Sequence, residues 1–228
     1  MNESFRFWEL MEQGGVVMWL LLVLSVIAAA ISVERFIALW RAKINVSEFL
    51  KEIRKALIVN RSVLEAKKVC ERYRGPVASI LKAGLLKYGE PKEDIEKALE
   101  NAALYEMGRL ERGLVWLATV ANVAPLLGFF GTVTGMIRSF DALAQAGLSN
   151  PALVASGIKE ALTTTAGGLA VAIPVQILYN FFMSRIARFV RDIETAANML
   201  LETFSQMERE GITADNSAAP PAPAAKKS

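Results

Sequence analysis

The sequence predicts an all-α, three-span polytopic membrane protein whose two long helices extend into a cytoplasmic helical bundle. The chain has 228 residues, of which 53% are hydrophobic and 21% charged, and its mean hydropathy is +0.32. The apolar residues gather in three uncharged windows of 21, 25 and 24 residues, at 13–33, 113–137 and 161–184. Each window is long enough for a helix to cross a bilayer core, which takes about 20 residues.

The composition excludes several classes of function. The chain has no His and a single Cys, Cys70, so His-metal sites, cysteine-cluster zinc sites, His-dependent catalytic triads and a disulfide framework are all excluded. The glycine-containing stretch 131–135 lacks the Lys of a nucleotide-binding P-loop and lies inside an apolar window. We therefore expect no enzyme activity, no metal and no cofactor.

The first predicted span, 15–39, follows an outer N-terminal segment, 1–14. Only Ser25 interrupts the apolar run from Val16 to Ile31, whereas a soluble amphipathic helix would place polar residues at a helical period. The charge pattern around this span predicts an uncleaved reverse signal anchor with the N-terminus outside. Acidic residues precede the uncharged window 13–33, and basic residues follow it: Arg35, Arg41 and Lys43.

The distribution of basic residues predicts the orientation of the remaining chain. The segment 35–112 holds 17 Lys and Arg against 11 Asp and Glu, whereas 138–159 holds only one Arg and one Lys. Positively charged segments stay in the cytoplasm, so 40–112 and the C-terminus are expected there. Topology and anionic lipid explain the basic excess, and no nucleic-acid motif accompanies it.

The cytoplasmic region 40–112 has the pattern of several helices. Phe49, Ile53 and Leu57 fall on one helical face. Ser62 followed by Glu65 predicts a capping box that opens a second helix. A break at 75–76 precedes a third helix at 77–88, and Pro91 is expected at the first position of the next helix.

Two long helices are predicted to carry the second and third spans. The first runs without interruption from about Lys92 to about Ala142, with Gly108 and Gly113 only weakening it, and its roughly 50 residues would extend about 75 Å. The second long helix is predicted to begin at Pro151. The predicted segments are span two at 113–138, an outer connection at 139–156, span three at 157–184, a cytoplasmic helix at 185–210 and a disordered tail at 211–228.

Small residues along both later spans predict close helix packing. Span two places small and weakly polar residues on one face, and 131–135 forms a GxxxG pattern. Span three has a matching stripe of small and polar residues that includes Gln176 and Asn180, and its proline should bend the helix. The predicted packing residues are Pro125, Gly128, Gly131, Gly135, Gly168 and Pro174.

Four polar side chains are candidates for an ion path: Thr132, Thr164, Thr165 and Glu160. Each also has a structural alternative, because a threonine hydroxyl can bond its own helix and Glu160 can stabilise a helix N-terminus. Glu160 and Thr164 share a helical face, but Thr165 does not follow that spacing. No titratable residue lies in the middle of any span, so ion conduction would require a partner that brings a carboxylate.

Two sequences resemble the signatures of the MotA/TolQ/ExbB proton channel family. The sequence APLLGFFGTVTGM at 124–136 is similar to that family's second-span signature, and GIKEALTTTAGGLAVAIP at 157–174 is similar to its third. The start of the first span also resembles ExbB-type members. The similarity covers about residues 10–205, and three spans resemble ExbB or TolQ more than the four-span MotA stators.

The resemblance implies an ion-driven motor in the bacterial inner membrane, with its N-terminus in the periplasm. A homo-oligomer, a pentamer in the family's architecture, would surround single-span ExbD- or TolR-type partners that carry a membrane Asp and act on TonB or TolA. By motif position, Thr132 and Thr165 match the family's pore threonines and Glu160 its acid. The run of three threonines at 163–165 departs from the family pattern, which leaves H⁺ and Na⁺ both open as the driving ion.

Two other functions compete with this interpretation. A small-substrate transporter is disfavoured because three spans give no inverted repeat and no charged site. A structural membrane scaffold would use the small-residue stripes for assembly alone.

Overall fold

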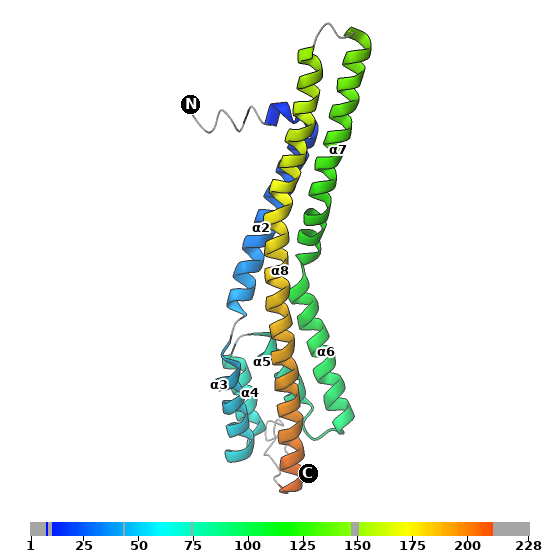
Figure 1. Ribbon diagram of the computed structural model, residues 1–228. Coiled ribbons are helices and arrows are strands. Elements are labelled where there is room, and N and C mark those ends of the chain that lie inside the picture. Colours follow the sequence, from blue (N-terminus) through cyan, green and yellow to red (C-terminus); the bar gives the residue numbers. More distant parts are fainter. Residues whose placement is uncertain (1–7, 9–10, 43, 74, 147–150, 212–228) are drawn as a thin grey trace, which may run out of the picture. The chain divides into compact units, whose positions relative to one another are not determined.

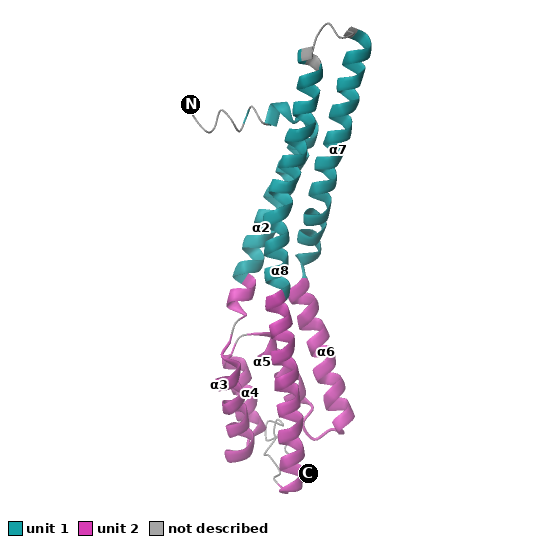
Figure 2. Ribbon diagram, viewed as in Figure 1, with its two compact units in different colours: residues 1–37, 112–183 teal, residues 38–111, 184–228 magenta. Residues whose placement is uncertain are grey.

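The computed structural model describes residues 8, 11–42, 44–73, 75–146 and 151–211, and these residues are almost wholly helical (Figure 1). They form seven α-helices and one short π-helical turn. The chain divides into two compact units, 1–37 with 112–183 and 38–111 with 184–228 (Figure 2). The all-helical fold class is therefore confirmed. The predicted tail and the tip of the outer connection fall outside the described residues.

Unit 1 is built from three helices that are long and apolar enough to cross a membrane. They are α2 (Gly15–Arg41), α7 (Leu114–Ala146) and the first part of α8 (Pro151–Arg209). Their shared core contains Met18 and Leu21 of α2, Ala124 of α7 and Ala172 of α8. Large apolar side chains cover the outside of the same helices, including Val23, Phe129 and Ile177, which are each more than half exposed. An apolar exterior is stable in lipid and costly in water.

The α7–α8 pair is an antiparallel hairpin whose helices approach at glycines. A Cβ atom at Gly128 would lie 2.9 Å from the carbonyl oxygen of Thr164, and one at Gly168 would lie 2.6 Å from that of Ala124. A Cβ at Gly135 would meet the Gly157 carbonyl oxygen at 2.9 Å. Because these neighbours are backbone atoms, a side chain could enter only if the helices separated. Small residues thus bring the two backbones together, as in close membrane-helix packing.

Both predicted span prolines lie within helices that continue on either side of them. Pro125 is inside α7 and Pro174 is inside α8. The bend expected at Pro174 stays a prediction. Most of the segment predicted as an outer connection is helical, because α7 extends to Ala146 and α8 begins at Pro151.

Unit 2 is a separate helical cluster with its own apolar core. Phe49, Leu57, Leu81 and Leu200 are fully buried within it. Gly84 allows close packing there, because a Cβ atom would lie 2.7 Å from Leu99 and 2.9 Å from Leu200. The elements are α3 (Val46–Arg54), η1 (Lys55–Val59), α4 (Val63–Arg72), α5 (Pro76–Leu86), α6 (Lys92–Glu111) and the remainder of α8.

The helix-start predictions in this unit are confirmed in part. Ser62 is the N-cap of α4, and its hydroxyl accepts a 3.3 Å hydrogen bond from the Glu65 backbone N–H. The Glu65 carboxylate, however, accepts from the Asn60 side-chain amide at 2.5 Å. Pro91 directly precedes α6, and its carbonyl accepts from the Ile95 N–H, so it occupies the cap and not the first helical position.

The prediction of one uninterrupted helix from Lys92 to Ala142 is wrong. Helix α6 ends at Glu111 and α7 begins at Leu114, with Gly113 at φ +87° between them. This left-handed conformation is easily adopted by glycine and ends a helix in the manner of a C-terminal glycine cap. The sequence prediction gave Gly113 only a weakening effect on the helix, whereas its left-handed backbone separates α6 from α7.

Candidate functional site

Two threonine side chains of α7 and α8 meet inside unit 1. The hydroxyl groups of Thr132 and Thr165 are hydrogen-bonded to each other. The Thr132 oxygen also lies 3.3 Å from the carbonyl oxygens of Gly128 and Ala161, and the Thr165 oxygen lies 3.2 Å from that of Gly128. Four oxygen atoms from two helices therefore form one small polar cluster within apolar spans.

The cluster contains two hydroxyl protons, whereas four oxygen atoms can accept a hydrogen bond: the two hydroxyl oxygens and the two carbonyl oxygens. Each hydroxyl carries one proton and can accept through its lone pairs. If Thr132 donates to Thr165, then Thr165 is free to donate to Gly128. If Thr165 donates to Thr132, then Thr132 can donate to Gly128 or Ala161. Rotation of the two hydroxyls reverses the direction of this hydrogen-bond chain without moving a heavy atom.

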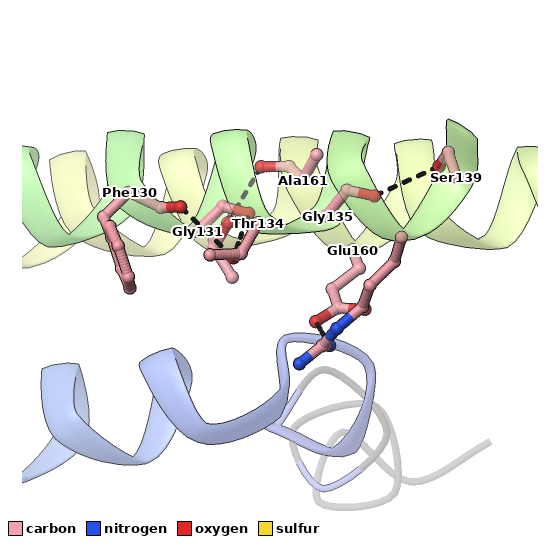
Figure 3. Close-up of polar contacts among 9 residues, drawn as sticks. Phe130, Gly131, Thr134, Gly135, Ser139, Glu160 and Ala161 are labelled. Carbon is pink, nitrogen blue, oxygen red and sulfur yellow. Dashed lines mark hydrogen bonds and ion pairs between the residues drawn. The ribbon is translucent and has the colours of Figure 1, made fainter. Parts of the chain in front are cut away.

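Glycine makes room for this contact. Gly128 lies one turn before Thr132, and an added Cβ there would be 3.1 Å from the Thr165 Cα. Ser139, two turns beyond Thr132, is buried and donates to the Gly135 carbonyl oxygen at 3.1 Å (Figure 3). Its oxygen also lies 3.2 Å from the carbonyl oxygen of Val154 on α8. The polar face of α7 is therefore satisfied partly by its own helix and partly by α8.

Thr164, another ion-path candidate, borders the threonine pair, because it shares the Ala161 carbonyl oxygen with Thr132. Thr164 is 1% exposed, and its hydroxyl donates to the Ala161 carbonyl of its own helix at 2.9 Å. Its side chain occupies the space that a Cβ on Gly131 would need. Thr164 therefore packs α8 against α7 in the described arrangement.

Glu160 forms an ion pair that the sequence reasoning missed. The Nη1 atom of Arg138 on α7 lies 2.5 Å from its Oε1 atom. The carboxylate is directed towards the start of α2 (Figure 3), where a Cβ on Gly15 would lie 3.1 Å from the same oxygen. The hairpin register could have revealed this pair, because Arg138 lies eight residues before the end of α7 and Glu160 nine residues after the start of α8.

Two amide side chains of α8 lie on its exposed face. The Gln176 side-chain amide donates to the Asn180 side-chain oxygen at 3.2 Å, and both residues are exposed. They belong to a span whose other exposed residues are mostly apolar, such as Ile173 and Ile177. Among the described residues, no cluster of three potential metal ligands of the His, Cys, Asp or Glu type occurs.

Comparison with known sequences supplies the family. Residues 73–195 match the MotA/TolQ/ExbB proton channel family, and this match includes both threonines and Glu160. A relative named as an ExbB homolog in biopolymer transport, from Methanothermobacter thermautotrophicus, is 31% identical over 192 residues, which are 84% of this chain and 68% of the relative. The chain belongs to the MotA/TolQ/ExbB proton channel family.

Other relatives carry both ExbB and TolQ names. A biopolymer transport protein named ExbB-like 1, from Synechocystis sp., is 35% identical over 188 residues, covering 81% of this chain and 73% of its own length. The Tol-Pal system protein TolQ of Pseudomonas aeruginosa is 45% identical over 93 residues, covering 41% and 40%. This MotA/TolQ/ExbB member is therefore a transport-associated membrane protein, and its family supports a general role in an energy-transducing proton channel.

Proposed function

We propose that this chain is the proton-conducting motor subunit of an inner-membrane complex of the ExbB–ExbD–TonB or TolQ–TolR–TolA type. The complex would couple proton-motive force to outer-membrane transport or envelope work. One observation carries the proposal: Thr132 and Thr165 hold their hydroxyls together between two apolar helices, in a cluster that can reverse its hydrogen bonds.

The conducting complex needs a carboxylate that this chain does not place in the middle of its spans. No Asp or Glu occurs in 113–137 or 161–184. An intramembrane carboxylate is the usual carrier of a proton across apolar surroundings. We therefore propose a single-span partner of the ExbD or TolR type that brings a membrane Asp to the threonine pair.

Several copies of the chain, five by the family's architecture, would enclose that partner. Gln176 and Asn180 support the assembly, because exposed amides in an apolar span are costly unless a neighbouring chain or enclosed water covers them. We place the N-terminus in the periplasm and unit 2, with the C-terminus, in the cytoplasm. The support is the basic excess of 35–112, which positive-inside topology explains.

The scaffold and transporter alternatives make different predictions about ion movement. A scaffold would assemble with its partner but conduct nothing, and a transporter would require a small substrate. We favour conduction at the polar cluster, because its hydroxyl and carbonyl oxygens come together between the otherwise mostly apolar helices α7 and α8.

Ion flux in reconstituted vesicles tests the proposal. The chain and a single-span ExbD- or TolR-type protein from the same organism would be co-purified and placed in liposomes that carry a pH-sensitive dye. We expect proton flux under an imposed potential, and a loss of flux when the partner's membrane Asp is changed to Asn. A stable complex without flux, under both H⁺ and Na⁺ gradients, would contradict the proposal and favour a scaffold.

A further inference from the structure

The Glu160 carboxylate lies where all three helices of unit 1 meet. It is carried by α8, it pairs with Arg138 of α7, and its Oε1 atom faces the first residue of α2. That residue is Gly15, at φ +58°, where a Cβ would come within 3.1 Å of the carboxylate and 3.9 Å of the Arg138 guanidinium. The α2 backbone can approach the pair this closely because glycine has no side chain.

The two charges of the pair differ in their exposure. The Glu160 side chain is 21% exposed, whereas that of Arg138 is 63% exposed. A largely covered carboxylate is costly without a counter-charge, so the carboxylate depends on the guanidinium more than the reverse. The guanidinium reaches it from the exposed surface of α7 and fixes one of its two oxygens.

The pair lies at a distance from the threonine cluster. Glu160 precedes Thr165 by five residues, about 7.5 Å along the helix axis. Arg138 follows Thr132 by six residues, about 9 Å. The charged pair therefore lies closer than the two hydroxyls to the hairpin end of α7 and α8.

We propose that Arg138 is a positioning residue for Glu160: its guanidinium holds the carboxylate against the start of α2, on the hairpin side of the Thr132–Thr165 cluster. The inference rests on the proposed function, since it assigns a neighbour that sets where the charge of Glu160 acts. It differs from a simple surface ion pair, because the carboxylate is fixed from two sides, by Arg138 and by the close approach of Gly15. Loss of the guanidinium should release the carboxylate while the α7–α8 glycine contacts remain.

The first part of the test does not depend on ion flux. Membranes containing the full complex would be treated with a water-soluble carbodiimide and a small amine, and labelling of Glu160 would be followed by peptide mass spectrometry. A carboxylate held by a guanidinium and covered by α2 should react slowly. We expect Arg138→Gln to raise the labelling rate several-fold, and Arg138→Lys to raise it less. Lys159→Gln removes a neighbouring charge from an exposed position and is the matched control.

The second part of the test uses flux in the same variants. We expect Arg138→Gln to lower flux at least several-fold at unchanged membrane abundance, and Arg138→Lys to retain most of it. Lys159→Gln should behave as the unmodified protein.

Each outcome decides between the two proposals. Unchanged labelling in Arg138→Gln would overturn the positioning role, whatever the flux. The positioning role would also be overturned if Glu160 is labelled faster in Arg138→Gln while Arg138→Gln and Glu160→Gln both keep normal flux. Arg138 would then position a group that has no part in conduction. The proposal for the threonine pair would stand in that case. Faster labelling in Arg138→Gln, in a complex whose unmodified form conducts nothing, would instead contradict the proposed function.

Discussion

Thr132 and Thr165 lie at equal distances from the ends of the helices that they connect. Thr132 is 14 residues before the end of α7, and Thr165 is 14 residues after the start of α8. In an antiparallel hairpin this places them at the same level, and their hydroxyls are hydrogen-bonded. Gly128 and Gly168, 18 and 17 residues from the same ends, provide the close approach beside them. The polar contact therefore depends on a register that small residues maintain.

Replacing Gly135 by Leu should disrupt the α7–α8 pair. A Cβ at this position would already lie 2.9 Å from a backbone oxygen of Gly157 and 3.0 Å from the Ala161 side chain. Overpacking typically costs about 1–3 kcal/mol, and backbone neighbours cannot rotate away. We expect a lower thermal midpoint and less assembled complex by native mass spectrometry. Gly108→Leu is the matched control, since nothing lies within 4 Å of its Cβ position; equal damage from both changes would contradict the packing account.

Replacing Gly113 by Ala should destabilise the protein through backbone strain. Its φ of +87° is unfavourable for residues with a Cβ, and a left-handed residue costs about 1–2 kcal/mol. Gly108→Ala, within α6, should instead stabilise by about 0.5–1 kcal/mol because alanine favours a helix. Denaturation of the two variants in detergent measures this opposite effect. If the Gly113→Ala variant is instead more stable, the account of backbone strain is contradicted and the predicted uninterrupted helix is favoured.

Replacing Phe49 by Ala should destabilise unit 2. The side chain is fully buried and its ring packs against Tyr73, with ring centroids 5.0 Å apart. Loss of a buried phenylalanine costs about 3–5 kcal/mol. We expect a protease to cut the Phe49→Ala variant within α3–α5 faster than the unmodified protein. Val59 is exposed, so Val59→Ala should change the cleavage rate little. Identical proteolysis of both variants would show that the described core does not hold this unit together.

Cys70 should resist thiol reagents in the folded protein. Burial raises the pKa of its thiol from 9.0 to about 12, so at pH 8 the reactive thiolate is about a thousandfold rarer than in the unfolded chain. We expect slow labelling by a maleimide in native membranes and rapid labelling in denaturant. Because the folded state favours the thiol, this contribution to stability is complete below pH 9 and is lost as the pH rises towards 12. Fast native labelling would mean that α4 is not packed as described.

The sequence predicted the helical class and three apolar windows because hydrophobic length is a local property. The start of the last helix at Pro151 was also predictable, since proline is favoured at the first position. The break at Gly113 was not, because glycine within a helix pattern and glycine at a helix end look alike without the backbone conformation. The π-helical turn at Lys55–Val59 had no sequence signal that we recognised.

The candidate site was predictable as residue types but not as contacts. Apolar surroundings singled out Thr132, Thr165 and Glu160, whereas their partners depend on the register of the hairpin. Arg138 was counted only as a flanking charge, and Thr164 shares a helical face with Glu160 but is buried against Gly131. The observed ends of α7 and α8 bring Arg138 and Glu160 to nearly the same level, whereas the predicted helix end at about Ala142 did not.

Flux through the Thr132→Val/Thr165→Val complex tests the central claim most directly. Valine keeps the shape and removes both hydroxyls, whereas the Thr132→Ser/Thr165→Ser complex keeps them. Thr134→Val is the matched control, because among the described residues the Thr134 hydroxyl donates only to carbonyls of α7, those of Phe130 and Gly131 (Figure 3). We predict that the double valine complex assembles at normal abundance and loses at least tenfold in proton flux, while the serine and Thr134 variants conduct. Normal flux through the double valine complex would contradict the account and leave the threonine pair as packing alone.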